Sequence, residues 1–103
     1  MVRVTVLYPN TPGSRFDMDY YVREHCPMVM ERLGAACKGF GVEEGAAGIM
    51  PPGKAAYRTT AWFLFDSMES FQAAFGPHAE EITGDIPNYT DLQPVIQAGV
   101  VRA

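Results

Sequence analysis

The sequence has few charged residues, only two cysteines and no long apolar run. Charged residues make up 19% of the 103 residues, and the formal net charge is −4. The basic residues are scattered and form no stripe that could follow phosphates, which argues against nucleic acid as a partner. No apolar run approaches the roughly 20 residues that a membrane span needs, so we expect no membrane partner. The two cysteines provide neither a disulfide framework nor the spacing of metal ligands.

The first residues lack the basic-then-apolar pattern of a secretory signal and begin directly with a strand-like stretch. With the unpaired cysteines, this predicts a cytoplasmic location. What is present is an ordinary globular composition, with 48% hydrophobic and 12% aromatic residues. We expect residues 1–103 to form a single domain, and the somewhat apolar surface favours self-association.

Apolar patterns with the period of a strand and of a helix follow one another in the order β-α-β-β-α-β. Strands are predicted at residues 2–7, 38–47, 57–65 and 92–101, and helices at 17–33, 66–75 and 78–83. This order predicts an α+β, ferredoxin-like fold, in which a four-stranded antiparallel sheet carries its helices on one face. We expect Asp17 and Asp66 to cap the two longer helices, and Pro27 to kink or break the first of them near residues 24–26.

The face of the sheet that the helices leave uncovered is predicted to be apolar. Its members are Leu7, Trp62, Leu64, Val95 and Val101. A second copy of the same sheet, related by two-fold symmetry, would remove these side chains from water. We therefore predict a homodimer in which two sheets face each other as a barrel.

His25 stands on the apolar stripe of the first predicted helix. The stripe consists of Met18, Val22, His25, Val29 and Leu33. Side chains three and four residues apart share a helical face, so the imidazole should point into the interior. Burial would lower its pKa and favour a neutral general base near pH 7. The spacing also fits a core histidine that is hydrogen-bonded to a backbone carbonyl, so both interpretations stay open.

Two stretches of the sequence, Val6–Val29 and Ala74–Thr90, resemble the EthD family, which is named for a protein associated with ethyl tert-butyl ether degradation. The matching residues are Phe16-Asp17, Tyr20-Tyr21, His25 and Pro27 in the first stretch, and Phe75, His78, Asp85-Ile86-Pro87 and Tyr89 in the second. The resemblance implies the dimeric α/β barrel fold. Proteins of this fold include muconolactone isomerases, cofactor-free quinone-forming monooxygenases, polyketide cyclases and haem proteins, so the fold selects no reaction.

In this fold a ligand pocket typically lies between the helices and the sheet, on the side that His25 faces. The predicted pocket wall consists of Tyr21, Tyr57, Phe63, Phe71, Phe75, His78 and Tyr89. His78 fits a solvated position in a first helical turn as well as a site role. A metal site of His25 and His78 would lack a third ligand, so we expect no metal and no cofactor.

Other polar residues are explained by local structure. Asp85 and Asn88 flank Ile86-Pro87 in a predicted loop, where turn formation accounts for both. Cys26 and Cys37 fit small buried hydrophobic residues better than nucleophiles.

The sequence leaves three hypotheses for function. The first is a cofactor-independent isomerase, cyclase or oxygenase in which His25 acts as acid and base on a small hydrophobic or aromatic compound. The second is a non-catalytic accessory protein that binds a lipophilic intermediate for a partner oxidative degradation system. The third is a protein without a cavity, in which His25 is only packed.

Overall fold

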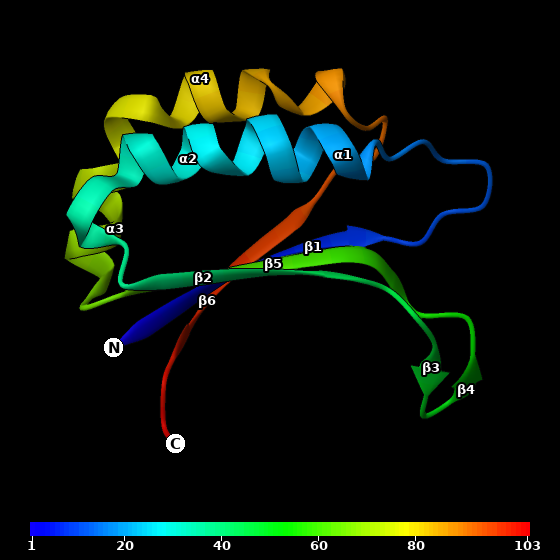
Figure 1. Ribbon diagram of the computed structural model, residues 1–103. Helices are drawn as coiled ribbons and strands as arrows, with labels where there is room; N and C mark the ends of the chain where they lie inside the picture. The colour runs from blue at the N-terminus through cyan, green and yellow to red at the C-terminus, as the bar shows by residue number, and fades with distance from the viewer.

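Four antiparallel strands form one sheet in the order β2-β5-β1-β6 (Figure 1). The computed structural model describes residues 1–103. The strands are β1 (Val2–Pro9), β2 (Gly39–Glu44), β5 (Tyr57–Phe65) and β6 (Val95–Val100). Helices cover one face of this sheet, which confirms the predicted α+β, ferredoxin-like architecture.

The alternation of side chains along the two central strands builds the floor of the core. Val2 pairs with Phe65 and Val4 pairs with Phe63, so these four side chains share the face that is turned toward the helices. All four are at least nine-tenths buried. The period-two pattern of the sequence therefore places the inner face of the sheet correctly.

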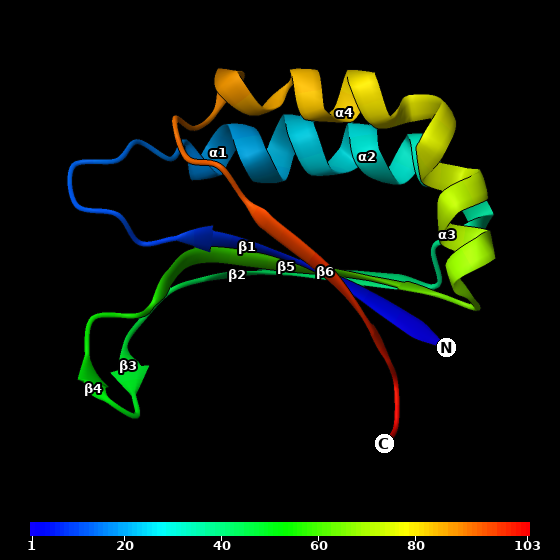
Figure 2. The same ribbon diagram turned by 180° about the vertical axis from the view of Figure 1, so that it is seen from behind.

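The helical layer consists of two rods that lie side by side across the sheet (Figures 1 and 2). One rod contains α1 (Met18–Tyr20), a π-helical turn (Tyr21–His25) and α2 (Cys26–Leu33). The segments of the other rod are α4 (Ala79–Gly84) and a 3₁₀ turn (Ile86–Asn88), and α3 (Met68–Phe75) leads into it. Arg32 on the first rod donates hydrogen bonds of 2.8 and 2.9 Å to the carboxylate of Glu81 on the second. None of these helices has the length and hydropathy needed to cross a bilayer.

We predicted a kink or a break near residues 24–26; the first rod stays continuous there and widens into a π-helical turn at Tyr21–His25. Proline has no N–H for the carbonyl four residues earlier, and the Cys26 N–H donates to the carbonyl of Tyr21, five residues earlier. The turn shifts the buried face by one position. Tyr21 is only 2% exposed, whereas Val22, which we expected on the apolar stripe, is 48% exposed. The predicted direction of His25, Val29 and Leu33 is correct, because all three are buried.

Two further predictions need correction. The residue that caps α3 is Ser67, whose Oγ accepts a 3.0 Å hydrogen bond from the Ser70 N–H, and not Asp66 one position earlier. The strand predicted at 38–47 spans only β2 (Gly39–Glu44), and a small hairpin of β3 (Gly48–Ile49) and β4 (Pro52–Gly53) follows it. Asp17 caps the first helix as expected, through a 3.1 Å hydrogen bond from the Tyr20 N–H.

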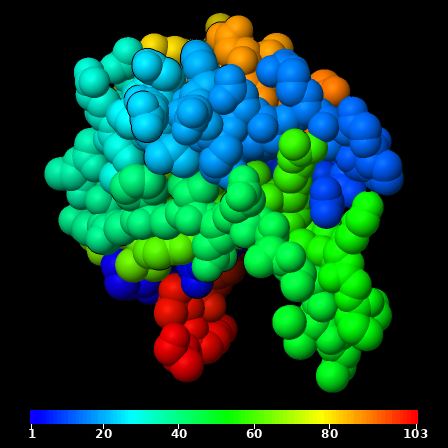
Figure 3. Space-filling model, turned by 45° about the vertical axis from the view of Figure 1, so that its right-hand side comes forward, coloured from blue at the N-terminus to red at the C-terminus, as the bar shows by residue number.

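No helix covers the other face of the sheet (Figures 1 and 2). Trp62 occupies the middle of this outer face, with the Arg3 guanidinium 4.8 Å from its ring centre. Gly41 on β2 gives the indole its room, since a Cβ at this position would lie 2.5 Å from Trp62 Nε1. The β3–β4 hairpin and the C-terminal residues project on this same side of the body (Figure 3). Val95 at 56% and Val101 at 41% exposure leave apolar surface here.

Candidate functional site

A cavity of about 310 Å³ lies between the helical layer and the sheet. Hydrophobic residues provide 14 of the 17 that line it. Its volume lies at the lower end of the roughly 300–1,000 Å³ typical of ligand pockets, which suits a compound of one or two rings. The presence of this cavity contradicts the hypothesis that the interior is solidly packed.

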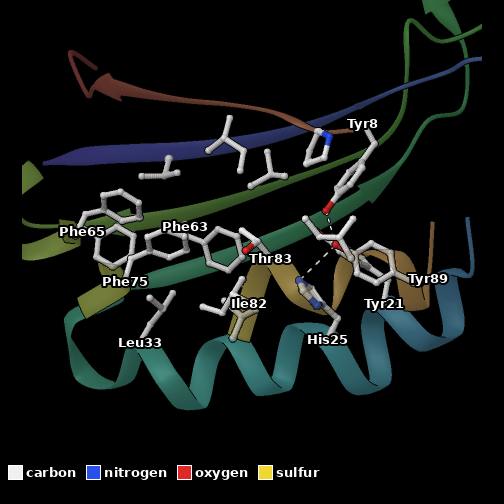
Figure 4. A pocket seen from close by; sticks show the side chains of 17 residues that line it. Tyr8, Tyr21, His25, Leu33, Phe63, Phe65, Phe75, Ile82, Thr83 and Tyr89 are labelled. Atoms are coloured by element: carbon white, nitrogen blue, oxygen red, sulfur yellow. Dashed lines mark hydrogen bonds between the residues drawn. The ribbon is translucent and has the colours of Figure 1, made fainter. Parts of the chain in front are cut away.

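The two ends of the cavity differ in chemistry (Figure 4). One end is hydrocarbon and aromatic, and its labelled members are Leu33, Phe63, Phe65 and Phe75. Phe71 belongs to the same end, because its ring centre lies 5.1 Å from that of Phe65 and 5.2 Å from that of Phe75. The opposite end gathers Tyr8, Tyr21, His25 and Tyr89. A ligand that fits this shape has an apolar ring at one end and a hydrogen-bonding group at the other.

His25 is held at the polar end by Asp85, which follows α4. His25 Nδ1 lies 2.8 Å from Asp85 Oδ2, and the imidazole is only 5% exposed. The carboxylate also accepts a 2.7 Å hydrogen bond from the Tyr20 hydroxyl and a 2.8 Å one from Asn88 Nδ2. Because an ionised carboxylate only accepts hydrogen bonds, Nδ1 carries the proton and Nε2 has a free lone pair. The histidine partner is thus a carboxylate and not a backbone carbonyl.

Nε2 of His25 faces a chain of two tyrosine hydroxyls (Figure 4). Tyr89 Oη lies 3.5 Å from His25 Nε2 and 2.5 Å from Tyr8 Oη. The Tyr21 ring stacks on the imidazole, with ring centres 5.4 Å apart and an interplanar angle of 16°. The imidazole is therefore fixed by hydrogen bonding at Nδ1 and by stacking on its face.

Burial and hydrogen bonding shift the pKa values of His25 and Asp85. Burial lowers the pKa of His25, although the hydrogen bond and charge of Asp85 partly offset this effect. Burial would raise the pKa of Asp85, but hydrogen bonds from Asn88, His25 and Tyr20 outweigh it and bring the pKa below its usual value.

The three tyrosines that surround His25 stay protonated. Burial raises the pKa of Tyr8, and it raises the pKa values of Tyr21 and Tyr89 far above the usual value of 10.0. The tyrosines therefore keep their protons at neutral pH, and His25 is the basic group of this cluster. Burial also raises the pKa of the Cys26 thiol to about 11, so this thiol is no nucleophile there.

His25 separates the cavity from a polar groove on the surface. Asp85 lines this groove together with Tyr20, Glu24, Met28, Glu81, Gly84 and Asn88. The Asp85 side chain is 16% exposed, so its carboxylate reaches solvent while its partner imidazole reaches the cavity. A proton that arrives at Nε2 from the cavity thus generates a cation that is neutralised from the surface side.

A second surface groove beside β6 adjoins the cavity. Both share Thr83, Ile86, Pro94 and Ile96. These residues come from α4, the turn after it, and the start of β6. The cavity therefore approaches the surface between these elements.

The structure brings together most of the residues expected in the pocket wall. Tyr21, Phe63, Phe71, Phe75 and Tyr89 line the cavity with His25.

Tyr57 and His78 lie elsewhere. Tyr57 is 40% exposed at the start of β5. His78 Nδ1 lies 3.9 Å from Glu81 Oε1, with 36% of its side chain exposed.

Sequence reasoning missed Tyr8, Tyr20 and Asp85. Asp85 belongs to the second EthD-like stretch, and that match was the one available signal for its role. Tyr8 has the same parity as the buried Val4 on β1, which predicts the same inward direction. No group of three or more histidine, cysteine, aspartate or glutamate side chains is placed to hold a metal ion.

Comparison with known proteins places the chain in a family. Residues 14–93 match the model of the EthD domain. The chain belongs to the EthD family. An EthD-like protein of Ralstonia eutropha JMP134 is 47% identical over 95% of this chain and 88% of its own, with a TM-score of 0.89.

More distant structures share the fold. An EthD family protein of Bacillus halodurans C-125 is 15% identical over 99% of both chains, with a TM-score of 0.68. An Arabidopsis thaliana protein is 13% identical over 100% of this chain and 97% of its own, with a TM-score of 0.71. No curated protein matches this chain.

Proposed function

We propose that this EthD-family protein binds a small hydrophobic or aromatic compound in its cavity and that His25 transfers protons to and from that compound. One observation carries the proposal: His25 Nδ1 is bonded to Asp85 at 2.8 Å, and Nε2 is directed toward the cavity. A neutral imidazole with this tautomer is a general base, and its protonated form is a general acid. The carboxylate fixes the tautomer and stabilises the imidazolium that forms.

This arrangement supports reactions that need only proton transfer. Isomerisation and cyclisation of an oxygenated compound fall in this class, as does deprotonation of a phenol before a cofactor-free oxidation. The side chains we propose to hold the compound are Tyr21, Phe63, Phe71, Phe75 and Tyr89. The aromatic rings would provide apolar contacts, and the hydroxyls would orient an oxygen.

A second candidate function is that of an accessory protein that holds a lipophilic intermediate for a partner oxidative degradation system. The observation that favours it is that His25 is the one basic side chain that lines the cavity. Binding needs no second acid or base, whereas many proton transfers between two positions use a pair. A cytoplasmic location agrees with both candidates and with the two free thiols.

The experiment that tests the proposal is native mass spectrometry of freshly purified protein, followed by extraction and identification of any bound compound. We then expect wild-type protein to convert the recovered compound, while His25→Gln binds it without conversion. Recovery of an unchanged compound after incubation with both proteins would favour the accessory role. Failure of the purified protein to bind any small hydrophobic compound would contradict both.

We further propose that two copies pair through their outer sheet faces. Leu64 and Val95 share the outer face of the sheet with Trp62, no helix covers this face, and a second sheet would do so. Sedimentation of wild-type protein at micromolar concentration should give a dimer, and Trp62→Glu should give a monomer. Val22→Glu is the matched control, because Val22 is 48% exposed on the helical side of the molecule. A wild-type monomer would refute the pairing.

A further inference from the structure

We propose that Tyr89 and His25 together recognise the oxygen of a neutral phenol or enolisable ketone, with Tyr89 donating a hydrogen bond to the oxyanion formed when His25 takes the proton. This inference rests on the proposed function and names the substrate class of the same site. It assigns Tyr89 a role in binding the reacting oxygen, beyond that of an aromatic wall.

The lining of the cavity points to an uncharged substrate. It contains no lysine, arginine, aspartate or glutamate. A carboxylate or phosphate group would lose its water there without gaining a cation. Asp85, on the far side of His25, adds a negative charge that would repel such an anion further.

The polar atoms available to a ligand lie at one end of the cavity. Thr83 is the only polar lining residue besides His25 and the tyrosines, and its hydroxyl already donates to the Ala79 carbonyl at 2.8 Å. The remaining surface is hydrocarbon or aromatic. A matching substrate has one oxygen-bearing end and an apolar ring, and not polar groups at both ends.

The position of the Tyr89 hydroxyl suits an oxyanion donor. The 3.5 Å between Tyr89 Oη and His25 Nε2 exceeds the roughly 2.7–3.2 Å of a good hydrogen bond, so neither group is fully satisfied by the other. At 2.5 Å from Tyr89, the Tyr8 hydroxyl can donate to it and leave the Tyr89 proton free for a ligand. The raised pKa of Tyr89 keeps that proton in place.

The Tyr89 ring is also held rigidly. Tyr89 is 0% exposed, and its ring centre lies 4.6 Å from that of His25 and 4.9 Å from that of Tyr21. A donor fixed in apolar surroundings stabilises a developing negative charge without first reorienting. Tyr89 therefore combines a protonated hydroxyl with a fixed direction.

The proton transfer balances without an oxidant or cofactor. In a ketone, the Cα–H bond breaks, the proton goes to His25 Nε2, and the C–H electron pair forms the enolate C=C bond. The carbonyl π pair moves to oxygen, where Tyr89 donates its hydrogen bond. Where the ketone carries a neighbouring β,γ C=C bond, the enolate is a dienolate; return of the proton to its γ-carbon shifts the double bond and gives an isomer, and His25 is neutral again. In a phenol, the O–H proton goes to Nε2, and the phenolate oxygen accepts from Tyr89.

The test uses two one-ring probes that differ at the oxygen. 4-Nitrophenol becomes yellow when it ionises, and 4-nitroanisole has a methyl group in place of the acidic proton. Wild-type protein should bind both, and bound 4-nitrophenol should be ionised at a pH where the free probe is mostly neutral. Tyr89→Phe should weaken binding of 4-nitrophenol roughly tenfold to a hundredfold, the value of a hydrogen bond to a charged group. Its affinity for 4-nitroanisole should change less than about twofold, which also shows that the cavity is intact.

Two further variants separate the roles of the two ends. His25→Gln should retain binding of 4-nitroanisole but abolish the ionisation of bound 4-nitrophenol. Phe71→Leu, at the apolar end, should weaken both probes alike.

Each contrary outcome is informative. If Tyr89→Phe weakens both probes equally, Tyr89 is only part of the wall and the inference is wrong. If wild-type protein binds both probes but 4-nitrophenol stays neutral, the substrate class is wrong while the cavity remains a binding site. If neither probe binds, the proposed function fails together with the inference.

Discussion

Protonation of His25 is expected to destabilise the fold, and Asp85 is expected to limit that loss. Burial lowers the pKa of His25 below its ordinary value of 6.5, and the carboxylate of Asp85 opposes this effect. A group whose pKa is lower in the folded state contributes stability above its unfolded pKa and loses it as the pH falls toward the folded one. The free energy of unfolding should therefore be constant above the ordinary pKa and fall as the pH drops below 6.5.

One proton sets the size of this effect. Between the folded-state and unfolded-state pKa values of His25, the unfolded protein binds up to one more proton than the folded protein. The free energy of unfolding therefore changes by at most about 1.4 kcal/mol per pH unit. At about pH 5 the loss in the free energy of unfolding cannot exceed about 2 kcal/mol. Asp85→Asn removes the charge that supports the imidazolium, so the pKa of His25 falls further and more of this loss is realised. Asp85 itself adds a second decline only as the pH falls below its ordinary value of 3.8.

The assay is urea unfolding followed by circular dichroism at several pH values from about 8 down to about 5, a range that includes the ordinary pKa of histidine and lies above that of aspartate. A His78→Gln background removes the only other histidine. The variant with Asp85→Asn should lose more stability than its parent over this range. A parent curve that stays flat or rises toward low pH would refute the buried neutral imidazole. Parallel curves for the two proteins would refute Asp85 as its charge partner.

Other substitutions test separate parts of the structure. Asp85→Asn should also move the imidazole proton of His25 from Nδ1 to Nε2, because the new amide can donate a hydrogen bond to Nδ1. Long-range ¹H–¹⁵N spectra report the tautomer, and a proton that stays on Nδ1 would contradict this prediction. Ser67→Ala should lower the free energy of unfolding by about 1 kcal/mol, whereas Asp66→Ala should have little effect, and equal losses in urea unfolding would contradict the assigned cap. Phe65→Ala should cost about 3–5 kcal/mol in the same assay, because this 0% exposed ring leaves a hole in the core, and a loss under about 1 kcal/mol would mean that the site collapses around it.

The period of the apolar pattern was enough to predict the sheet and the inward direction of His25. Strand β5 shows why: Thr59, Ala61, Phe63 and Phe65 are buried, and every second residue fits that face. Such a pattern depends only on the geometry of one strand, which neighbours do not change. The ferredoxin-like order of elements followed from several patterns of this kind.

The partner of His25 could not be found in the same way. Asp85 stands next to Ile86-Pro87, where turn formation is a sufficient local explanation for an aspartate. Its contact with His25 spans 60 positions in the chain and depends on how the turn after α4 lies against the first helical rod. No local period encodes that distance. Only agreement with a family motif marked Asp85 in the sequence.

The π-helical turn explains both why Val22 is not buried as predicted and how two tyrosines reach the His25–Asp85 pair. It places the neighbours Tyr20 and Tyr21 on opposite sides of the His25–Asp85 pair: the Tyr20 hydroxyl donates to Asp85 at the surface, and the Tyr21 ring stacks on His25 inside. A regular α-helix separates neighbouring side chains by about 100° and accommodates no extra residue in the turn. The residue after Cys26 is proline, which cannot donate the α-helical hydrogen bond, and the Cys26 N–H instead reaches back to Tyr21. The missing donor of Pro27 thus favours the local geometry that brings a hydroxyl to the carboxylate and a ring to the imidazole from consecutive positions.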